Sequence, residues 1–237
     1  MDYTPYTEFS TKVLGVTFND IELLITAFTH RSYVNEHKKT VSVHNERLEF
    51  LGDAVLELVV TEYLYGNFND PEGVLTNWRS ALVRTESIGA AALKAGFEPL
   101  LRLSRGEKRG SDRAREQILA NSYEAVTGAL YLDQGYDAAK KFITETILST
   151  FKQILDSGSW MDPKSHLQEV VQSKEGFTPV YKVLEEVGPD HDKVFTVGVF
   201  VNNNLRGSGS GPSKQNGQQK AAEAALEYYA GKLPTIV

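Results

Sequence analysis

Three acidic residues in the segment 45–56 have a spacing that would bring them together on a helix. Glu46, Glu49 and Asp53 are separated by three and four positions, so a helix presents their carboxylates on one face. Like charges on one face repel one another unless a cation compensates them. The spacing is therefore compatible with a solvated acidic stripe or with a cation site.

The apolar neighbours of these acids favour the cation site. The segment and its continuation contain the large apolar residues Leu48, Phe50, Leu51, Val55, Leu58, Val59 and Val60. They are too many and too widely distributed for an exposed helix, so part of the acidic face should lie near buried surface.

Further oxygen ligands occur elsewhere in the chain. Asn121 and Glu124 are three positions apart on another predicted helix and would share one face. Glu72 follows the break after the acidic segment and lies within possible reach. Oxygen ligands from two helices, with no cysteine and no suitably paired histidine, favour a hard cation such as Mg²⁺ or Mn²⁺ over zinc. Beside a phosphodiester, such an ion would polarise a phosphoryl oxygen and lower the pKa of a bound water.

Helices must position these residues, because helical periodicity dominates the first two thirds of the chain. Asn19 and Asp20 can cap the first helix. The predicted helices cover residues 21–28, the acidic segment to about residue 65, two stretches within 72–95, and residues 115–133 and 137–155. The pattern predicts an all-α domain over residues 1–156.

A polar linker at residues 157–162 leads into a region with a different pattern. The elements predicted there are a helix at 164–173, strands at 179–187, 193–202 and 205–209, and a helix at 212–229. This α-β-β-β-α order predicts a small α+β domain over residues 163–232. Gly207 to Lys214 lacks the spacing of a phosphate-binding loop, so a strand end and helix cap are expected there and no nucleotide cofactor.

Composition sets outer limits on function. No apolar run reaches the roughly 18 residues of a membrane span, and the N-terminus does not resemble a signal peptide, so no membrane association is expected. The absence of cysteine fits a reducing setting. A net charge of −6 counts mildly against a nucleic-acid partner. However, six basic residues crowd between positions 102 and 115, where a solvated loop and a phosphate-contacting loop are both compatible with the sequence.

Several segments resemble the ribonuclease III family. Residues 44–56 resemble its signature motif, residues 29–33 the stretch before that motif, and residues 117–125 its second acidic motif. The tail is similar to a double-stranded RNA-binding domain, with residues 188–191 between two strands and residues 211–214 opening the last helix. The resemblance runs through most of the chain in the family's own domain order.

The resemblance implies an endoribonuclease that hydrolyses double-stranded RNA with Mg²⁺, for which Mn²⁺ can substitute, and leaves 5′-phosphate ends. It implies a homodimer acting on ribosomal and messenger RNA precursors in the cytoplasm. Glu49, Asp53 and Glu124 match the family's catalytic, metal-binding carboxylates, and Glu46 matches an accessory acid at the edge of the site. Glu72 aligns with another accessory acid, one residue out of register.

The RNA-binding residues implied by the resemblance all lie in the tail. They are Gln168 and Glu169 on the first helix, Pro189, Asp190 and His191 in the loop entering the next minor groove, and Ser213 and Lys214 at the start of the last helix. Lys220, further along that helix, is expected to substitute in part for a second family lysine that is missing here. This spacing suits recognition of A-form RNA by shape. Gln215 stands where the family usually has a second lysine, so weaker and more salt-sensitive RNA binding is expected.

Asn121 is the main departure, because the family most often has a metal-binding aspartate at this position. An amide oxygen can ligate a divalent ion but supplies no charge. The alternative function is therefore a non-cleaving regulator that binds double-stranded RNA. A di-metal carboxylate oxidoreductase is a weaker alternative, because Glu-x-x-His pairs are absent and the RNA-binding tail is present.

Overall fold

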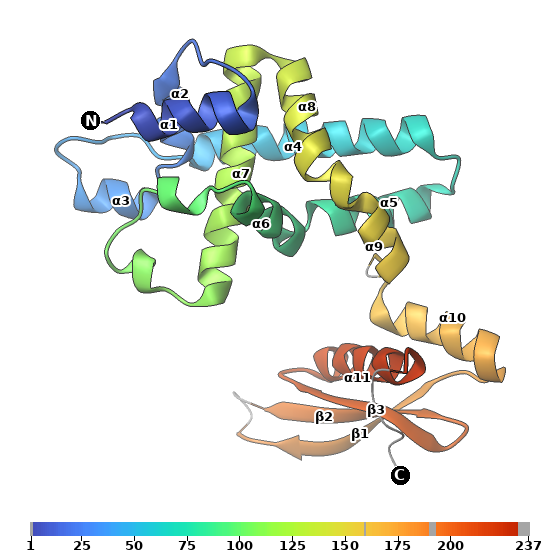
Figure 1. The fold of residues 1–237 in the computed structure, drawn as a ribbon. Helices are drawn as coiled ribbons and strands as arrows, with labels where there is room; N and C mark the ends of the chain where they lie inside the picture. The colour runs from blue at the N-terminus through green and yellow to red at the C-terminus, as the bar shows by residue number, and fades with distance from the viewer. Residues whose placement is uncertain (1, 159, 190–192, 232–237) are drawn as a thin grey trace. The chain divides into compact units, whose positions relative to one another are not determined.

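The computed structural model describes residues 2–158, 160–189 and 193–231. The chain divides into two compact units, residues 1–156 and residues 157–237. The first unit is helical and the second combines helices with a three-stranded sheet (Figure 1). Both predicted fold classes are therefore confirmed.

The helical unit contains nine α-helices and four short helical turns among the residues described. They are α1 (Thr4–Phe9), η1 (Ser10–Leu14), α2 (Ile21–Ala27), α3 (Arg31–Glu36), α4 (Glu46–Asn67), α5 (Glu72–Val83), α6 (Thr85–Lys94), η2 (Glu98–Leu100), η3 (Glu107–Arg109), α7 (Asp112–Gln134), α8 (Tyr136–Thr146), η4 (Leu148–Thr150) and α9 (Phe151–Ser157). As predicted, Asp20 caps α2, since its side chain accepts a hydrogen bond from the Glu22 amide.

The single helix predicted over residues 137–155 is wrong. The chain leaves α8 after Thr146 and passes through η4 before α9 begins at Phe151. The hydroxyls of Thr146 and Thr150 donate to the carbonyls of Phe142 and Ile147. Such side-chain bonds compete with the regular helical ladder and allow the chain to bend at this point.

Helix α7 is the central element of the unit (Figure 1). Its middle turns are buried on several sides, as shown by Leu119, Tyr123, Val126 and Leu130, and helices α2, α4, α6 and α8 pack against it. A helix surrounded in this way must be apolar around most of its circumference. Two polar side chains in these middle turns, Asn121 and Glu124, are only half-buried.

The second unit contains α10 (Pro163–Glu175), β1 (Val180–Val187), β2 (Val194–Val201), β3 (Asn204–Gly211) and α11 (Lys214–Tyr229). The strands are antiparallel in the order β1-β2-β3. Asn202 and Asn203 have positive φ angles of 47° and 63° and form the tight β2–β3 turn. Both helices pack on one face of the sheet, where Leu167, Val199 and Ala221 belong to a single core.

Candidate active site

Helices α4 and α7 cross with their backbones in contact at two glycines. A Cβ added to Gly52 would lie 1.7 Å from the Glu124 carbonyl oxygen, and one added to Gly128 would lie 2.3 Å from the Leu48 carbonyl oxygen. Any side chain at either position would force the helices apart. The sequence analysis did not identify this contact, although glycines inside apolar helical segments were a visible signal of close packing.

The crossing brings the predicted carboxylates together. Glu49 and Asp53 flank Gly52 on α4, and the backbone of Glu124 touches Gly52 from α7. Burial, and then the charges of Asp53 and Glu49, raise the pKa of Glu124 to about 8. Burial, and then the charges of Glu46 and Asp53, raise the pKa of Glu49. The acidic face therefore lies near buried surface, as the sequence analysis expected.

The apolar stripe of α4 is divided between buried and exposed residues. Leu48, Val55 and Val59 are buried against the rest of the unit, whereas Phe50 and Leu58 are exposed. The sequence predicted that the apolar residues of this helix bring part of the acidic face near buried surface, and it did not separate Phe50 and Leu58 from the residues that are buried. Composition shows that a residue is apolar, but it does not show whether the covering surface belongs to the same chain.

The carboxylates are not already assembled around an ion. Within the part of the chain that the structure describes, no group of three or more His, Cys, Asp or Glu side chains is arranged to hold a metal ion. The donors fit a hard divalent ion, because they are oxygens from two helices and two of the carboxylates, Glu49 and Glu124, are half-buried.

Asn121 lies one helical turn before Glu124 on α7, and its amide has a partner. The Nε2 atom of Gln117 donates a hydrogen bond to the Asn121 Oδ1 atom over 2.7 Å. The sequence analysis did not single out Gln117, although its separation of four positions from Asn121 places the two on one helix face.

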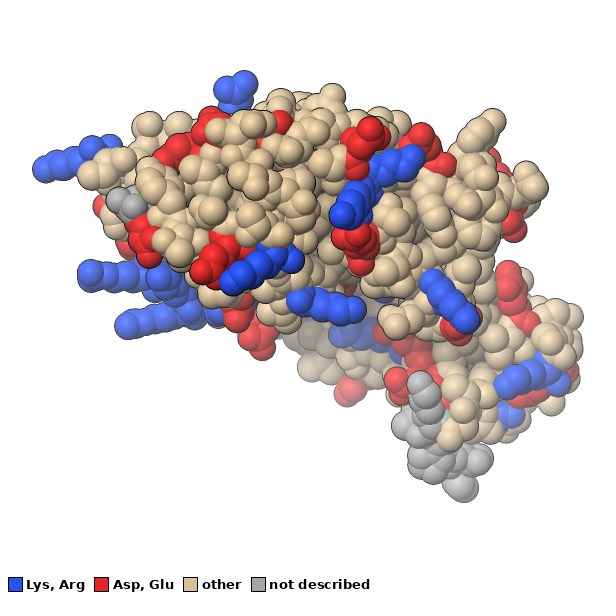
Figure 2. All heavy atoms as spheres, turned by 45° about the horizontal axis from the view of Figure 1, so that its top comes forward, with Lys and Arg blue, Asp and Glu red and all other residues tan. Residues whose placement is uncertain are grey.

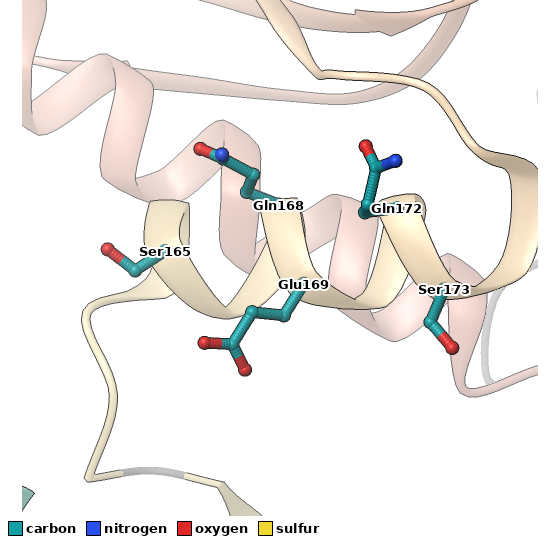
Figure 3. Close-up of a pocket in the computed structure, with 5 residues that line it drawn as sticks. All are labelled: Ser165, Gln168, Glu169, Gln172 and Ser173. Atoms are coloured by element: carbon teal, nitrogen blue, oxygen red, sulfur yellow. The ribbon is translucent and has the colours of Figure 1, made fainter.

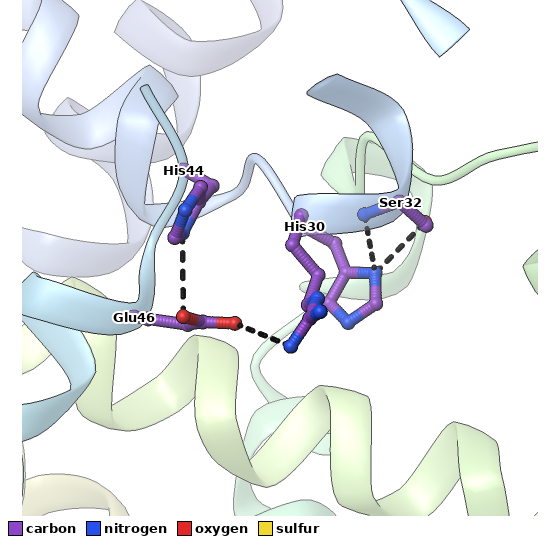
Figure 4. Close-up of polar contacts among 5 residues, drawn as sticks. His30, Ser32, His44 and Glu46 are labelled. Atoms are coloured by element: carbon purple, nitrogen blue, oxygen red, sulfur yellow. Dashed lines mark hydrogen bonds and ion pairs between the residues drawn. The ribbon is translucent and has the colours of Figure 1, made fainter. Parts of the chain in front are cut away.

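Glu46 lies at the edge of the site, at the first residue of α4 (Figure 4). Its carboxylate is 3.4 Å from the Arg31 Nη1 atom and 3.8 Å from the His44 Nδ1 atom. His30 caps α3, since its ring nitrogen accepts a hydrogen bond from the Ser32 amide. The start of α3 is thus tied to the start of α4 by the Arg31–Glu46 contact.

Glu72 lies apart from the acidic cluster within one chain. It begins α5, accepts a hydrogen bond from the Thr76 hydroxyl, and lines a hollow of about 450 Å³ with Thr61, Tyr65 and Arg79. Thr61 and Tyr65 belong to the C-terminal half of α4, whereas Glu49 and Asp53 belong to its N-terminal half. A helix rises about 1.5 Å per residue, so the length of α4 separates Glu72 from Glu124.

The basic segment before α7 is partly ordered by polar contacts. Arg102 stacks 4.4 Å from the Tyr33 ring centroid, Arg115 pairs with Glu98, and the Arg105 amide donates to the Glu36 carboxylate. Lys108 and Arg109 remain exposed. Figure 2 shows Lys and Arg side chains projecting at the left, on the side where Figure 1 places α3 and this segment. This surface is available to a polyanion.

The structure places most of the predicted RNA-binding residues on the surface of the second unit. Gln168 and Glu169 project from α10 beside a surface hollow (Figure 3), Pro189 is exposed after β1, and Lys220 is exposed on α11. Ser213 caps α11 through its hydroxyl. Asp190 and His191 lie outside the described residues.

Comparisons with known proteins identify both units. Residues 20–151 match the Ribonuclease-III-like family model, and residues 163–229 match the double-stranded RNA binding motif. The chain is 46% identical over 217 residues to Ribonuclease 3 of Enterococcus faecalis, covering 90% of this chain and 93% of that protein. The chain belongs to the ribonuclease III family.

Other ribonuclease III proteins agree with this assignment. Ribonuclease 3 of Geobacillus kaustophilus is 46% identical over 218 residues, which cover 90% of this chain and 87% of that protein. The solved nuclease domain of ribonuclease III from Campylobacter jejuni has a TM-score of 0.55 and 38% identity, and covers 61% of this chain and 98% of that one. The prediction of a double-stranded RNA endoribonuclease is confirmed, and no comparison favours the non-cleaving regulator.

Ribonuclease III enzymes depend on divalent metal ions, which agrees with the oxygen donors at the α4–α7 crossing.

Among the described residues, no helix is both long and apolar enough to cross a membrane.

Proposed function

We propose that this ribonuclease III hydrolyses duplex RNA at the crossing of α4 and α7, with Mg²⁺ held by Glu49, Asp53, Asn121 and Glu124. Mn²⁺ can substitute. The observation that carries the proposal is the close α4–α7 contact at Gly52, which brings half-buried Glu124 toward half-buried Glu49 and exposed Asp53. In agreement with this contact, burial and then the charges of Asp53 and Glu49 raise the pKa of Glu124 to about 8. A fold gains nothing from such a cluster of carboxylates unless a cation occupies it.

The residues have separate tasks in this proposal. A divalent ion would supply Lewis-acid activation of the phosphoryl group and a more acidic bound water. Glu49, Asp53 and Glu124 provide the negative charge that holds the ion, and Asn121 adds a neutral oxygen. Glu46, paired with Arg31 and His44, is an accessory acid at the rim, and Glu72 remains an accessory acid in a separate hollow.

Incubation of the full chain with an end-labelled RNA duplex tests this function. Cleavage is expected with Mg²⁺ or Mn²⁺ and not with a chelator, because the carboxylates alone provide no electrophile. The products are expected to carry 5′-phosphates, which a kinase can label only after phosphatase treatment. A single strand of the same sequence is the matched control and should remain intact.

Tight duplex binding without cleavage at any Mg²⁺ or Mn²⁺ concentration would contradict the proposal and favour a non-cleaving binding protein. If the variant Asn121→Asp then cleaved the duplex, the missing charge at position 121 would explain why the wild type does not cleave.

We further propose that the second unit holds the duplex through exposed residues of α10 and of the start of α11, and through the connection between β1 and β2. Gln168, Glu169 and Pro189 would reach minor grooves, together with Asp190 and His191. Ser213, Lys214 and Lys220 would contact the phosphates between those grooves. Lys214 supports this assignment because it is exposed at the first residue of α11 and its Nζ atom lies 5.6 Å from the Phe195 ring centroid.

Substitution of Lys214 by alanine is expected to weaken duplex binding several-fold at low salt and to reduce the slope of log affinity against log salt by about one. One lost phosphate contact releases one fewer counterion. Binding is measured by fluorescence anisotropy in chelator, so that the duplex is not cut. Lys12→Ala is the control, since Lys12 is already paired with Glu8. An unchanged slope for Lys214→Ala would remove Lys214 from the phosphate contacts.

We propose that the enzyme is a homodimer formed through the exposed side of α4. Phe50 and Tyr65 are each 82% exposed and Leu58 is 57% exposed, and their spacing of eight and seven positions places them on one helix face. A stripe of large apolar side chains in water indicates an interface, and a closed two-fold pairing is the commonest arrangement. The Campylobacter jejuni nuclease domain is described as having a region involved in dimer formation.

Phe50→Glu is therefore expected to convert the dimer into a monomer, because it would place a charge in the apolar interface formed by the stripe. Analytical ultracentrifugation at micromolar protein measures the change. Leu93→Glu is the control, since Leu93 is exposed on α6 rather than on α4. A Phe50→Glu variant that remains dimeric would place the interface elsewhere.

The proposed domain limits are residues 1–156 for the nuclease domain, 157–162 for the linker and 163–232 for the RNA-binding domain. Asp162 caps α10 through its side chain and Pro163 occupies the first turn, which supports the start of the second domain at residue 163.

Ribosomal and messenger RNA precursors in the cytoplasm are the proposed substrates.

A further inference from the structure

The amide of Asn121 has two chemically different ends, and only one of them can bind a cation. A carboxylate presents oxygen in either orientation, whereas an asparagine presents oxygen in one orientation and an NH₂ group in the other. An NH₂ group facing the ion site would repel a cation. An asparagine ligand therefore needs a neighbour that determines which end faces the site.

Gln117 provides such a neighbour. It precedes Asn121 by one turn on α7, and its Nε2 atom donates to the Asn121 Oδ1 atom over 2.7 Å. This bond turns the oxygen of the Asn121 amide, rather than its NH₂ group, toward Gln117. An amide oxygen accepts two hydrogen bonds or ligands, so one lone pair of Oδ1 remains for a cation. Donation to the same oxygen also polarises it and makes it a better ligand.

The type of residue at position 117 matters as well. Lysine or arginine could donate to the same oxygen, but each would bring a positive charge close to the ion. Aspartate or glutamate would accept rather than donate, and would turn the NH₂ group of Asn121 toward itself. Glutamine donates a hydrogen bond without adding charge. Groups behind the direct ligands commonly orient them, and their loss typically lowers metal affinity by about 10- to 100-fold.

We propose that Gln117 is a positioning residue for the metal site: it holds the side-chain oxygen of Asn121 so that a neutral amide can act as a ligand. The proposal rests on the proposed metal site at Glu49, Asp53, Asn121 and Glu124. It assigns a role to an uncharged residue at the start of the second acidic motif, and it ties the loss of charge at position 121 to the side chain one turn before it.

Binding of Mn²⁺ alone to the full chain, followed by electron paramagnetic resonance without RNA, tests the proposal. Gln117→Met keeps the side-chain length and removes the donor, and is expected to weaken Mn²⁺ binding about tenfold. Asn121→Ala is expected to weaken binding at least as much. The double variant should bind like Asn121→Ala, because Gln117 acts only through Asn121.

Repeating Gln117→Met in the Asn121→Asp protein distinguishes the positioning of residue 121 from other effects of losing Gln117. A carboxylate presents oxygen in both orientations, so Gln117→Met should change Mn²⁺ affinity less than about twofold in that background. Gln117 is exposed, and the melting temperature of the metal-free Gln117→Met variant should match that of the wild type. An equal loss of affinity in both backgrounds would overturn the positioning role.

Failure of the metal site and failure of the Gln117 role give different results. If Asp53→Asn weakens Mn²⁺ binding and Gln117→Met does not, the site stands and the role of Gln117 is refuted. If the wild type and Asp53→Asn bind Mn²⁺ equally, the site itself is refuted and the role of Gln117 with it.

Discussion

The Glu124→Gln variant is expected to cleave duplex RNA more slowly than the wild type by a factor on the order of a thousand or more. Glu124 contributes a carboxylate from α7 opposite the two from α4, and its side chain is only partly solvated. Glutamine keeps the shape and removes the charge that holds the ion. Single-turnover cleavage of a labelled duplex at saturating protein and Mg²⁺ measures the effect.

The same variant is expected to be more stable than the wild type when no metal is present and the pH is alkaline. Burial, and then the charges of Asp53 and Glu49, raise the pKa of Glu124 from 4.5 to about 8. Between these values the folded state keeps a proton that the unfolded state has lost, so the free energy of unfolding falls as pH rises. Above the folded pKa, glutamine removes a cost on the order of 1–3 kcal/mol.

Urea unfolding in chelator, at about pH 5 and about pH 8.5, measures this difference. The two proteins should be similar at the lower pH and differ at the higher one. Glu86→Gln makes the same chemical change at an exposed position of α6, away from the proposed site and interface, and should leave both cleavage and pH dependence unchanged. A Glu124→Gln variant that cuts normally, or that shows the wild-type loss of stability with pH, would contradict the assignment of Glu124.

Gly52→Ala is expected to destabilise the protein by about 3 kcal/mol or more. Its Cβ would lie 1.7 Å from the Glu124 carbonyl oxygen and 2.8 Å from the Gly128 amide nitrogen, and backbone atoms cannot move aside without separating α4 from α7. Alanine improves helix propensity by only about 1 kcal/mol, so the steric cost dominates. Urea unfolding measures the change, and metal affinity should fall with it.

Gly66→Ala is the matched control in the same helix. A Cβ at Gly66 meets no atom within 4 Å, so this variant should be as stable as the wild type or more stable by roughly 0.5–1 kcal/mol. If Gly52→Ala behaved in the same way, the close contact between α4 and α7 would not exist in solution.

The effects expected for Glu124→Gln and Gly52→Ala both depend on the crossing of α4 and α7. The contact that excludes a side chain at Gly52 also brings Glu124 toward Glu49 and Asp53. The packing of the helical unit and the geometry of its acidic site therefore depend on the same crossing, and a change that widens the crossing should weaken both.

Much of the site could be predicted from local sequence. Other features of the site could not, as Phe50, Leu58 and Gln117 show. Glu49 and Asp53 share a helix, so their spacing alone places them on one face. Phe50 and Leu58 have the same apolar character as Val55, yet the structure leaves the first two exposed and buries the third. Gln117 carries no catalytic chemistry of its own, so its importance arises only from the hydrogen bond to Asn121.

The sequence by itself determined the residue types, the positions of most helices and strands, and the order of the two domains. These features depend on the 3.6-residue and two-residue periodicities, which act between neighbours along the chain. Only the tertiary structure decided which helix faces meet. The α4–α7 contact is possible because Gly52 and Gly128 lack side chains at the same crossing. That condition joins residues far apart in the chain, and no local pattern specifies it.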